Sequence, residues 1–319
     1  MLENFIFSAN AVLPIFLVIA FGYVLRRKNF LTPVAVAEMN RIVFVFALPF
    51  LLFRNTYQAD FNTLFDPRFI VWILVSTLAN FSLIWIFAEI YLRKNSDLIG
   101  AFVQASFRAN YAIVGIPLVA NIMGENDTGL ASLAAAFVVT SFNILSVIVL
   151  TAKNEQSGKL NLKLVVNMLV SVCKNPSIIA ITCGIVFNLI NLPIPYILWT
   201  GVNYMAILCT PMALIAAGAS IKVAEMMVHI RPAIVASALK IAVMPTIFVT
   251  ISVLLGFRGE PLAVIFAVFA NPTAIMSYVM ADRMNGNTAV TSAIILITTV
   301  FSSIALTIGV YLLRMFELV

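Results

Sequence analysis

Two matching stretches of sequence decide the fold: FRANYAIVGIPLVA at residues 107–120 and VFANPTAIMSYVMA at residues 268–281. Each is an apolar run that is interrupted by Asn and Pro, and the second Asn follows the first at a shift of 161 residues. Proline lacks an N–H and breaks the hydrogen bonding of a helix. The two stretches therefore predict a pair of broken apolar helices at corresponding positions of an internal repeat.

The composition around these stretches is that of a membrane protein. Of 319 residues, 62% are hydrophobic and 10% are charged, whereas a soluble domain carries about 25% charged residues. One soluble core of this length cannot bury so much apolar surface, and a disordered chain would contain far less of it. The net charge of +6 fits the basic cytoplasmic loops of membrane proteins and needs no nucleic acid partner.

We expect ten membrane-spanning helices, since each needs about 20 apolar residues to cross a bilayer. The fourth is interrupted near Asn110–Pro117 and the ninth at Asn271-Pro272. In order, the ten are Ala9–Leu25, Val34–Phe53, Phe69–Leu92, Leu98–Met123, Thr128–Ala152, Pro176–Leu192, Ile197–Ile221, Ala233–Leu255, Pro261–Ala281 and Thr288–Leu313.

Further pairs of residues support a repeat, although chance similarity among apolar helices is the alternative. Gly22 corresponds to Gly184, Pro49 to Pro211 and Thr128 to Thr288, at shifts of 160 to 162 residues. Residues 1–152 would form the first five-helix repeat, 153–174 a cytoplasmic linker with an interfacial segment, and 175–319 the second repeat. Because five is odd, the second repeat enters the membrane from the opposite side, as in many secondary transporters.

The distribution of basic residues predicts the orientation. With the N-terminus outside, twelve Lys and Arg fall in inner loops and four in outer segments. The inner residues are Arg26, Arg27, Lys28, Arg93, Lys94, Lys153, Lys159, Lys163, Lys174, Lys222, Arg231 and Arg283, and the outer ones are Arg54, Arg68, Arg258 and Arg314. Both termini should therefore lie outside the cell membrane (plasma or inner membrane), with the central loop in the cytoplasm.

The interrupted helices predict a binding site. Asn271 is a good N-cap and Pro272 suits the first position of a half-helix, so that Thr273 and free N–H groups would surround a positive dipole end. An anion such as a carboxylate is a natural ligand there. In the fourth span, Gly115 and Pro117 mark the break, and Asn110 lies seven residues earlier. The alternative is a structural kink that neighbouring helices satisfy.

Two cations lie deep within predicted spans, where each costs about 2.5–3.5 kcal/mol on insertion scales. Arg108 and Lys240 could attract an anionic substrate or replace a coupling ion; the alternatives are snorkelling or pairing with an internal carbonyl. Gln104 lies one turn before Arg108 on the same face. The candidate substrate-binding residues are Asn110, Asn271, Arg108, Thr273, Gln104 and Lys240, and the candidate crossover or hinge residues are Gly115, Pro117 and Pro272.

The sequence holds no motif that indicates an enzyme. It has no HExxH, GxSxG or Walker motif, and its single histidine, His229, belongs to a loop. We therefore expect no catalytic residues, no cofactor, no metal site and no drive by ATP. Cys173, Cys183 and Cys209 form no CxxC motif, and we expect them to be apolar fillers without a disulfide framework.

Several of these segments resemble the auxin efflux carrier family. The sequences FLTP at 30–33, NR at 40–41 and FALP at 46–49 are similar to its second span. NYAIVGIPL at 110–118 is similar to its fourth-span crossover, and residues 271–281 are more loosely similar to its ninth-span crossover.

The resemblance implies a ten-helix fold of two inverted repeats, similar to sodium/bile acid symporters. Helices 1, 2, 6 and 7 would form a scaffold domain, helices 3–5 and 8–10 a transport domain, and helices 4 and 9 would cross beside the substrate. The family's crossover residues correspond to Asn110, Pro117 and Pro272, and less securely to Asn271. Arg108 and the short polar centre differ from the plant exporters, which favours malate or malonate over auxin.

We therefore expect a secondary transporter of small organic anions, such as mono- and dicarboxylates or auxin-like acids, that works by an elevator motion. Its partners would be that anion and the lipid bilayer, and related folds suggest a homodimer by analogy. One alternative is a sodium-coupled symporter of bile-acid type, which would need acidic and amide sodium ligands at the crossover. Another is an anion channel, which would show no counterflow.

Overall fold

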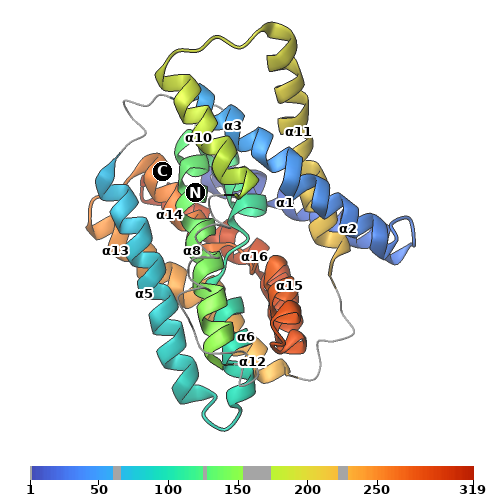
Figure 1. Cartoon of the computed structure of the whole chain (residues 1–319). Coiled ribbons are helices and arrows are strands. Elements are labelled where there is room, and N and C mark those ends of the chain that lie inside the picture. Colours follow the sequence, from blue (N-terminus) through green and yellow to red (C-terminus); the bar gives the residue numbers. More distant parts are fainter. Residues whose placement is uncertain (1, 60–65, 125–127, 154–173, 222–228) are drawn as a thin grey trace.

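The computed structural model describes residues 2–59, 66–124, 128–153, 174–221 and 229–319, and these residues are almost entirely helical (Figure 1). The predicted linker and interfacial segment lies almost wholly outside them, as does Cys173, whereas Cys183 and Cys209 are free thiols. The helices are α1 Leu2–Arg27, α2 Pro33–Ile42, η1 Val43–Ala47, α3 Leu48–Gln58, α5 Pro67–Tyr91, α6 Ser96–Phe107, η2 Tyr111–Gly115, α7 Ile116–Met123, α8 Gly129–Lys153, α10 Pro176–Leu189, α11 Tyr196–Ala219, α12 Ile230–Ala238, η3 Leu239–Val243, α13 Met244–Leu254, α14 Gly259–Ala270, α15 Met276–Arg283 and α16 Thr288–Met315.

Seven helical stretches in the described residues are long and apolar enough to cross a membrane. They correspond to the expected spans one, two, three, five, seven, eight and ten. The expected sixth span is the shorter helix α10, and the fourth and ninth are each divided into two helical pieces. The described residues are thus helical as expected, with seven stretches that could each span a membrane and three apolar segments that are short or broken.

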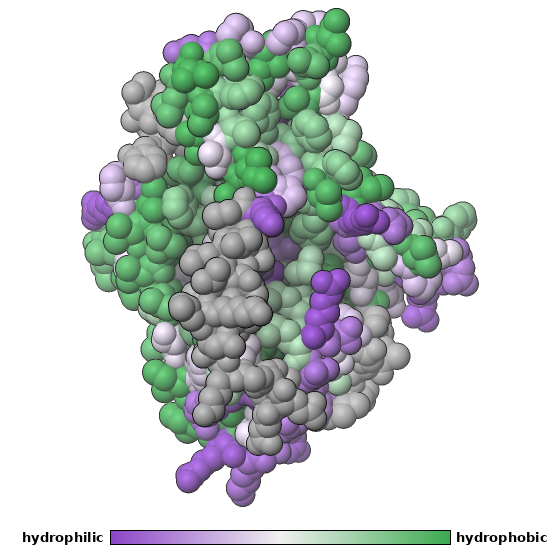
Figure 2. Space-filling view, in the orientation of Figure 1, coloured by the Kyte–Doolittle hydropathy of each residue, from purple (hydrophilic) through white to green (hydrophobic). Residues whose placement is uncertain are grey.

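The surface of the protein is largely apolar. Leu17, Ile90, Ile197 and Leu254 are large hydrophobic residues with most of their surface exposed. The face in Figure 2 is hydrophobic over much of its area, with hydrophilic residues at its lower end, at its right edge and near its centre. In water this exposure would cause aggregation, whereas in a bilayer these side chains face lipid tails. The exposed apolar surface is therefore suited to contact with the lipid bilayer.

The helices can be grouped into two sets, a smaller and a larger one, which also pack closely against each other. The smaller set consists of α1, α2, α3, α10 and α11, along the top and right of Figure 1, and the larger set of α5 to α8 and α12 to α16. Within the smaller set, α1 packs along α11 and α3 along α10. Gly22, Gly218 and Gly184 face the backbone of the neighbouring helix at these contacts, where a Cβ would collide. The contacts between the sets are formed mainly by α1 with α16 and α7 and by α3 with α8.

Three π-helical turns each precede a proline. Pro49, Pro117 and Pro245 stand at the second position of α3, α7 and α13, directly after η1, η2 and η3. A proline inside a helix loses one hydrogen bond and clashes with the carbonyl four residues earlier. In each case that carbonyl lies in the wider π turn, and the residue before the proline donates its N–H five residues back instead of four. The helices therefore continue past these prolines.

Candidate functional site

The two broken spans meet at their breaks. Helix α6 ends at Phe107 and α14 ends at Ala270, and the extended residues that follow pair in a short antiparallel bridge between Ala109 and Thr273. The Asn110 N–H donates to the Pro272 carbonyl at 2.8 Å, and the Ala274 N–H donates to the Arg108 carbonyl at 3.3 Å. Backbone groups that the broken helices leave without partners thus satisfy each other, as the membrane interior requires.

The predicted role of Asn271 and Pro272 at the start of a half-helix is wrong. Asn271 is the C-cap residue that directly follows α14, with φ −66° and ψ 152°, and the next helix, α15, begins only at Met276. A residue before proline is forced toward extended backbone because the proline ring clashes with a helical conformation. The sequence Asn271-Pro272 therefore ends one helix and leaves Pro272 in the extended crossover segment.

The predicted break at Gly115 and Pro117 is also misplaced. The chain is extended at residues 108–110, and it is helical from Tyr111 to Met123 because the π turn η2 accommodates Pro117. Gly115 has a different role: a Cβ there would lie 2.6 Å from Asn271 Nδ2 and from Tyr111 Cδ2. The missing side chain lets the second half of the fourth span pack directly against the end of α14.

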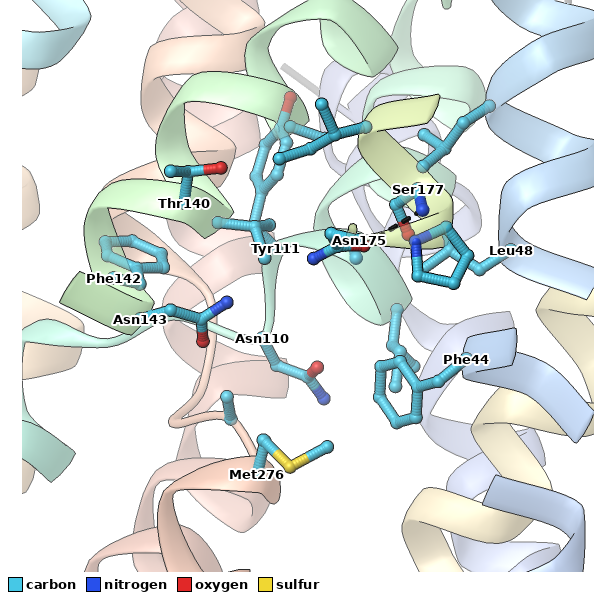
Figure 3. Close-up of a pocket in the computed structure, with 18 of the residues that line it drawn as sticks. Phe44, Leu48, Asn110, Tyr111, Thr140, Phe142, Asn143, Asn175, Ser177 and Met276 are labelled. Atoms are coloured by element: carbon cyan, nitrogen blue, oxygen red, sulfur yellow. Dashed lines mark hydrogen bonds between the residues drawn. The ribbon is translucent and has the colours of Figure 1, made fainter. Parts of the chain in front are cut away.

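A cavity of about 590 Å³ lies beside the crossover, between the two sets of helices. On one side it is lined by α2, η1, α3 and α10, and on the other by the crossover, α8 and α15. Figure 3 shows the Asn110 carboxamide reaching into the open space between Phe44 and Met276. The polar residues of the wall are Asn40, Arg108, Asn110, Tyr111, Thr140, Asn143, Lys174, Asn175 and Ser177.

Arg108 is a buried cation in this wall without an acidic partner. Only 5% of it is exposed, and its guanidinium donates to Asn143 Oδ1 at 2.8 Å and contacts Met280 Sδ at 2.6 Å. The ion pairs of the described residues, Arg41–Glu38 and Lys153–Glu89, do not include it. A buried charge that lacks a counter-charge is costly, so an anion in the cavity would be stabilised there.

The six predicted binding residues fall into two groups. Arg108 and Asn110 line the cavity, whereas Asn271, Thr273, Gln104 and Lys240 are buried in the protein behind it. Thr273 holds the crossover together, because its hydroxyl donates to the Ala105 carbonyl at 2.7 Å and its N–H donates to Thr298 Oγ1 at 3.1 Å. Gln104 and Asn271 are fully buried, and their amides make no hydrogen bond with the described residues.

Sequence reasoning missed Asn40 and Asn175 as cavity residues, and it regarded Asn143 only as an in-span polar residue that could line a path or bond to another helix. Asn143 stands three residues after Thr140, so both lie on the same face of α8, and this spacing was a usable signal. Asn175 caps α10 through its side chain, which accepts the Ser177 N–H at 2.9 Å. Nothing in the local sequence indicates that this cap faces the crossover, since α10 belongs to the other set of helices.

A second cavity of about 990 Å³ adjoins the first. The two share the wall residues Asn40, Phe44, Val45, Ile275, Met276 and Val279. The second cavity is basic, because its lining includes Arg26, Arg27, Arg41 and Arg283. Clefts lined by one sign of charge raise the local concentration of ions of the opposite sign. An anion could therefore accumulate next to the cavity that contains Arg108.

Comparison with known proteins agrees with this architecture. A family described as "Membrane transport protein", which is that of the auxin efflux carriers, matches residues 7–310. The chain belongs to this family. It is therefore a multi-pass membrane transport protein, and the resemblance noted in its sequence is confirmed.

Relatives of this transporter cover nearly its whole length. An uncharacterized transporter of Methanothermobacter thermautotrophicus is 23% identical over 305 residues, which is 95% of this chain and 97% of the relative. The uncharacterized transporter YfdV of Escherichia coli K12 is 21% identical over 312 residues, covering 97% and 98% of the two chains. The YfdV protein of Shigella flexneri matches with the same values. Each is named as a transporter, and none is named for a substrate.

Proposed function

We propose that the protein is a secondary transporter of small organic anions, with its substrate site in the cavity beside the crossover. The observation that carries this proposal is the buried guanidinium of Arg108, which faces the cavity region without an acidic partner. A carboxylate could accept hydrogen bonds from Arg108 and from the Asn110 carboxamide. The basic second cavity would supply the anion by electrostatic attraction.

The two sets of helices suggest how the substrate moves. We take the smaller set as the scaffold and the larger set, which carries the crossover, as the part that moves in an elevator motion. The cavity lies between the sets, so sliding one past the other would carry its contents across the membrane. Alternating access around a site at the crossover is common in transporters with broken helices.

Ten spans in two inverted repeats, with both termini outside the cell membrane and a cytoplasmic central loop, remain part of this proposal. The pairing within the smaller set supports it. Each close contact, α1 with α11 and α3 with α10, joins the first span of one proposed repeat to the second span of the other. Two equivalent pairings are what a pseudo-twofold axis in the membrane plane would produce.

Two alternatives make different predictions. A sodium-coupled symporter would need acidic and amide sodium ligands at the crossover. The crossover region instead contains the cations Arg108 and Lys240. A channel would conduct the anion without exchange, whereas a carrier exchanges labelled for unlabelled substrate.

Counterflow of labelled malate in proteoliposomes tests the proposal. We expect saturable counterflow that is independent of sodium and weakened about 10- to 100-fold in Arg108→Gln, which is the effect of losing a charge-assisted hydrogen bond. Arg93→Gln changes an exposed arginine outside both cavities and is the matched control. If malate, malonate and indole-3-acetate all fail with folded protein, or if Arg108→Gln exchanges as fast as the wild type, the proposal is wrong.

A further inference from the structure

Lys240 lies where the ends of two half-helices converge. The π turn η3 interrupts the helical stretch Ile230–Leu254, and it carries a lysine side chain that is 1% exposed. The Lys240 ammonium lies 3.4 Å from the Phe107 carbonyl oxygen and 3.3 Å from the Phe269 carbonyl oxygen. Phe107 is the last residue of α6 and Phe269 is the last but one of α14. The ammonium therefore contacts the carboxyl end of the first half-helix of each broken span, α6 and α14.

These two ends attract a positive charge. The last carbonyls of a helix have no partners within the helix, and together with the macrodipole they carry about half a negative charge. Two such ends facing one point come close to compensating one ammonium. The two nitrogen–oxygen distances are nearly equal and long for a hydrogen bond. The ammonium thus lies between the carboxyl ends of α6 and α14 and contacts both in a similar way, like a bound cation between two ligands.

No other compensation for this charge is found in the described residues. The ion pairs there do not include Lys240, and it lines neither cavity. Two fully buried amides stand at the same helix ends, Gln104 in the last turn of α6 and Asn271 at the end of α14, and neither has a hydrogen-bond partner among the described residues. Their oxygens are available in the same region of the protein for a cation.

We infer that Lys240 is a built-in counter-cation, whose ammonium permanently occupies a cation site formed by the carboxyl ends of α6 and α14. The crossover then needs no dissociable cation to compensate its two helix ends. Removing the side chain leaves an empty site that takes a small monovalent cation. The cation site does not depend on the proposed function, and only the effect on transport rests on it.

Two variants separate charge from volume. Lys240→Ala removes three carbons and the nitrogen, which is the set of heavy atoms in propylammonium, and so leaves room for that ion or for Na⁺. Lys240→Met fills most of the same space without a charge and leaves no room for an added ion. In lipid nanodiscs without substrate, the melting temperature of each variant is measured against NaCl or propylammonium chloride, with choline chloride keeping the ionic strength constant.

We expect the melting temperature of Lys240→Ala to rise saturably by about 2–4 °C with Na⁺ or propylammonium, because a ligand that binds only the folded state stabilises it. Wild type and Lys240→Met should not respond. An absent response in Lys240→Ala, or an equal response in the wild type, overturns the inference. If Lys240→Ala cannot be purified folded, recovery by purification in propylammonium supports the inference, and failure in every cation contradicts it.

Transport gives a second readout that packing alone would not change. Counterflow should fall at least about tenfold in Lys240→Met, and in Lys240→Ala it should be restored by propylammonium. If Lys240→Met exchanges substrate as fast as the wild type, the charge of Lys240 is dispensable and the inference is wrong. The melting experiment contains no substrate, so it still decides the question if the wild type carries none of the carboxylates tested. If the wild type shows normal counterflow but the melting temperature of Lys240→Ala does not respond to cations, the counter-cation inference is wrong and the proposed transport function still stands.

Discussion

At the scale of single residues, the crossover depends on small, polar and charged residues that lie inside otherwise apolar helical spans. Gly115 allows Asn271 to approach the backbone of η2, and Asn110 projects into the cavity. Arg108 is also a cavity residue, although its guanidinium is held by Asn143 on α8. Local sequence identified Arg108, Asn110 and Lys240 because a polar residue inside an apolar span is conspicuous. Their partners could not be identified, since Phe107 and Phe269 contribute backbone carbonyls that any residue would supply.

Gly115→Ala should destabilise the protein by about 1–3 kcal/mol, because its Cβ would overlap Asn271 and Tyr111 and overpacking costs this much. The measurement is thermal unfolding of the purified protein in nanodiscs. The matched control is Gly201→Ala in α11, where a Cβ would meet no atom within 4 Å. The control should be neutral or slightly stabilising, since alanine favours helix over glycine. Equal melting temperatures of the two variants would contradict the packing described for Gly115.

At the scale of elements, the structure differs from the prediction in where the helices break. The sequence contains prolines at 49, 117, 245 and 272, and proline alone does not distinguish a break from a bend. Three of them follow π turns and the helix continues, whereas Pro272 lies in an extended segment. The difference arises from tertiary pairing: residues 108–110 and 272–274 exchange backbone hydrogen bonds, which replace the helical ones. Sequence could place these breaks only within several residues.

The side chain of Thr273 ties the crossover to α6, so Thr273→Val should loosen it. Valine keeps the shape but removes the hydroxyl that donates to the Ala105 carbonyl, and a lost hydrogen bond of this kind costs about 1 kcal/mol, or more where a buried group stays unpaired. We expect a lower melting temperature and slower counterflow. Thr246→Val, on an exposed side of α13, is the control because its hydroxyl bonds only to its own helix. A Thr273→Val protein as stable as the control would show that this contact is unimportant.

At the scale of the whole molecule, the arrangement of the two sets makes the proposed motion testable. Asn55 on α3 donates to Ser132 on α8 at 3.0 Å, and this contact crosses between the sets. Asn40 on α2 donates to Ser220, next to the end of α11, at 3.3 Å, and this contact stays within the smaller set. The two pairs have the same chemistry and similar distances. They differ in that a cross-link at the first would join the two sets of helices, whereas a cross-link at the second would not.

Cross-linking should stop transport only where it joins the two sets. In a background with Cys173, Cys183 and Cys209 replaced by serine, Asn55→Cys with Ser132→Cys should exchange substrate when reduced and lose exchange when oxidised or bridged by mercury. Asn40→Cys with Ser220→Cys should exchange equally before and after oxidation. Each protein is compared with itself in the two redox states, so any effect of the substitutions cancels. Full exchange by the oxidised Asn55–Ser132 pair would rule out a sliding motion at this seam.

The bridge between Ala109 and Thr273 also has a consequence for how the protein is made. Its two residues are 164 positions apart in the chain, and at about 5–20 residues per second a ribosome delivers the second roughly 10–30 s after the first. During that interval the first break enters the bilayer with its backbone groups unpaired and with Arg108 lacking Met280 as a neighbour. The nascent first half therefore has to be shielded, by the insertion machinery or by water, until the second half arrives.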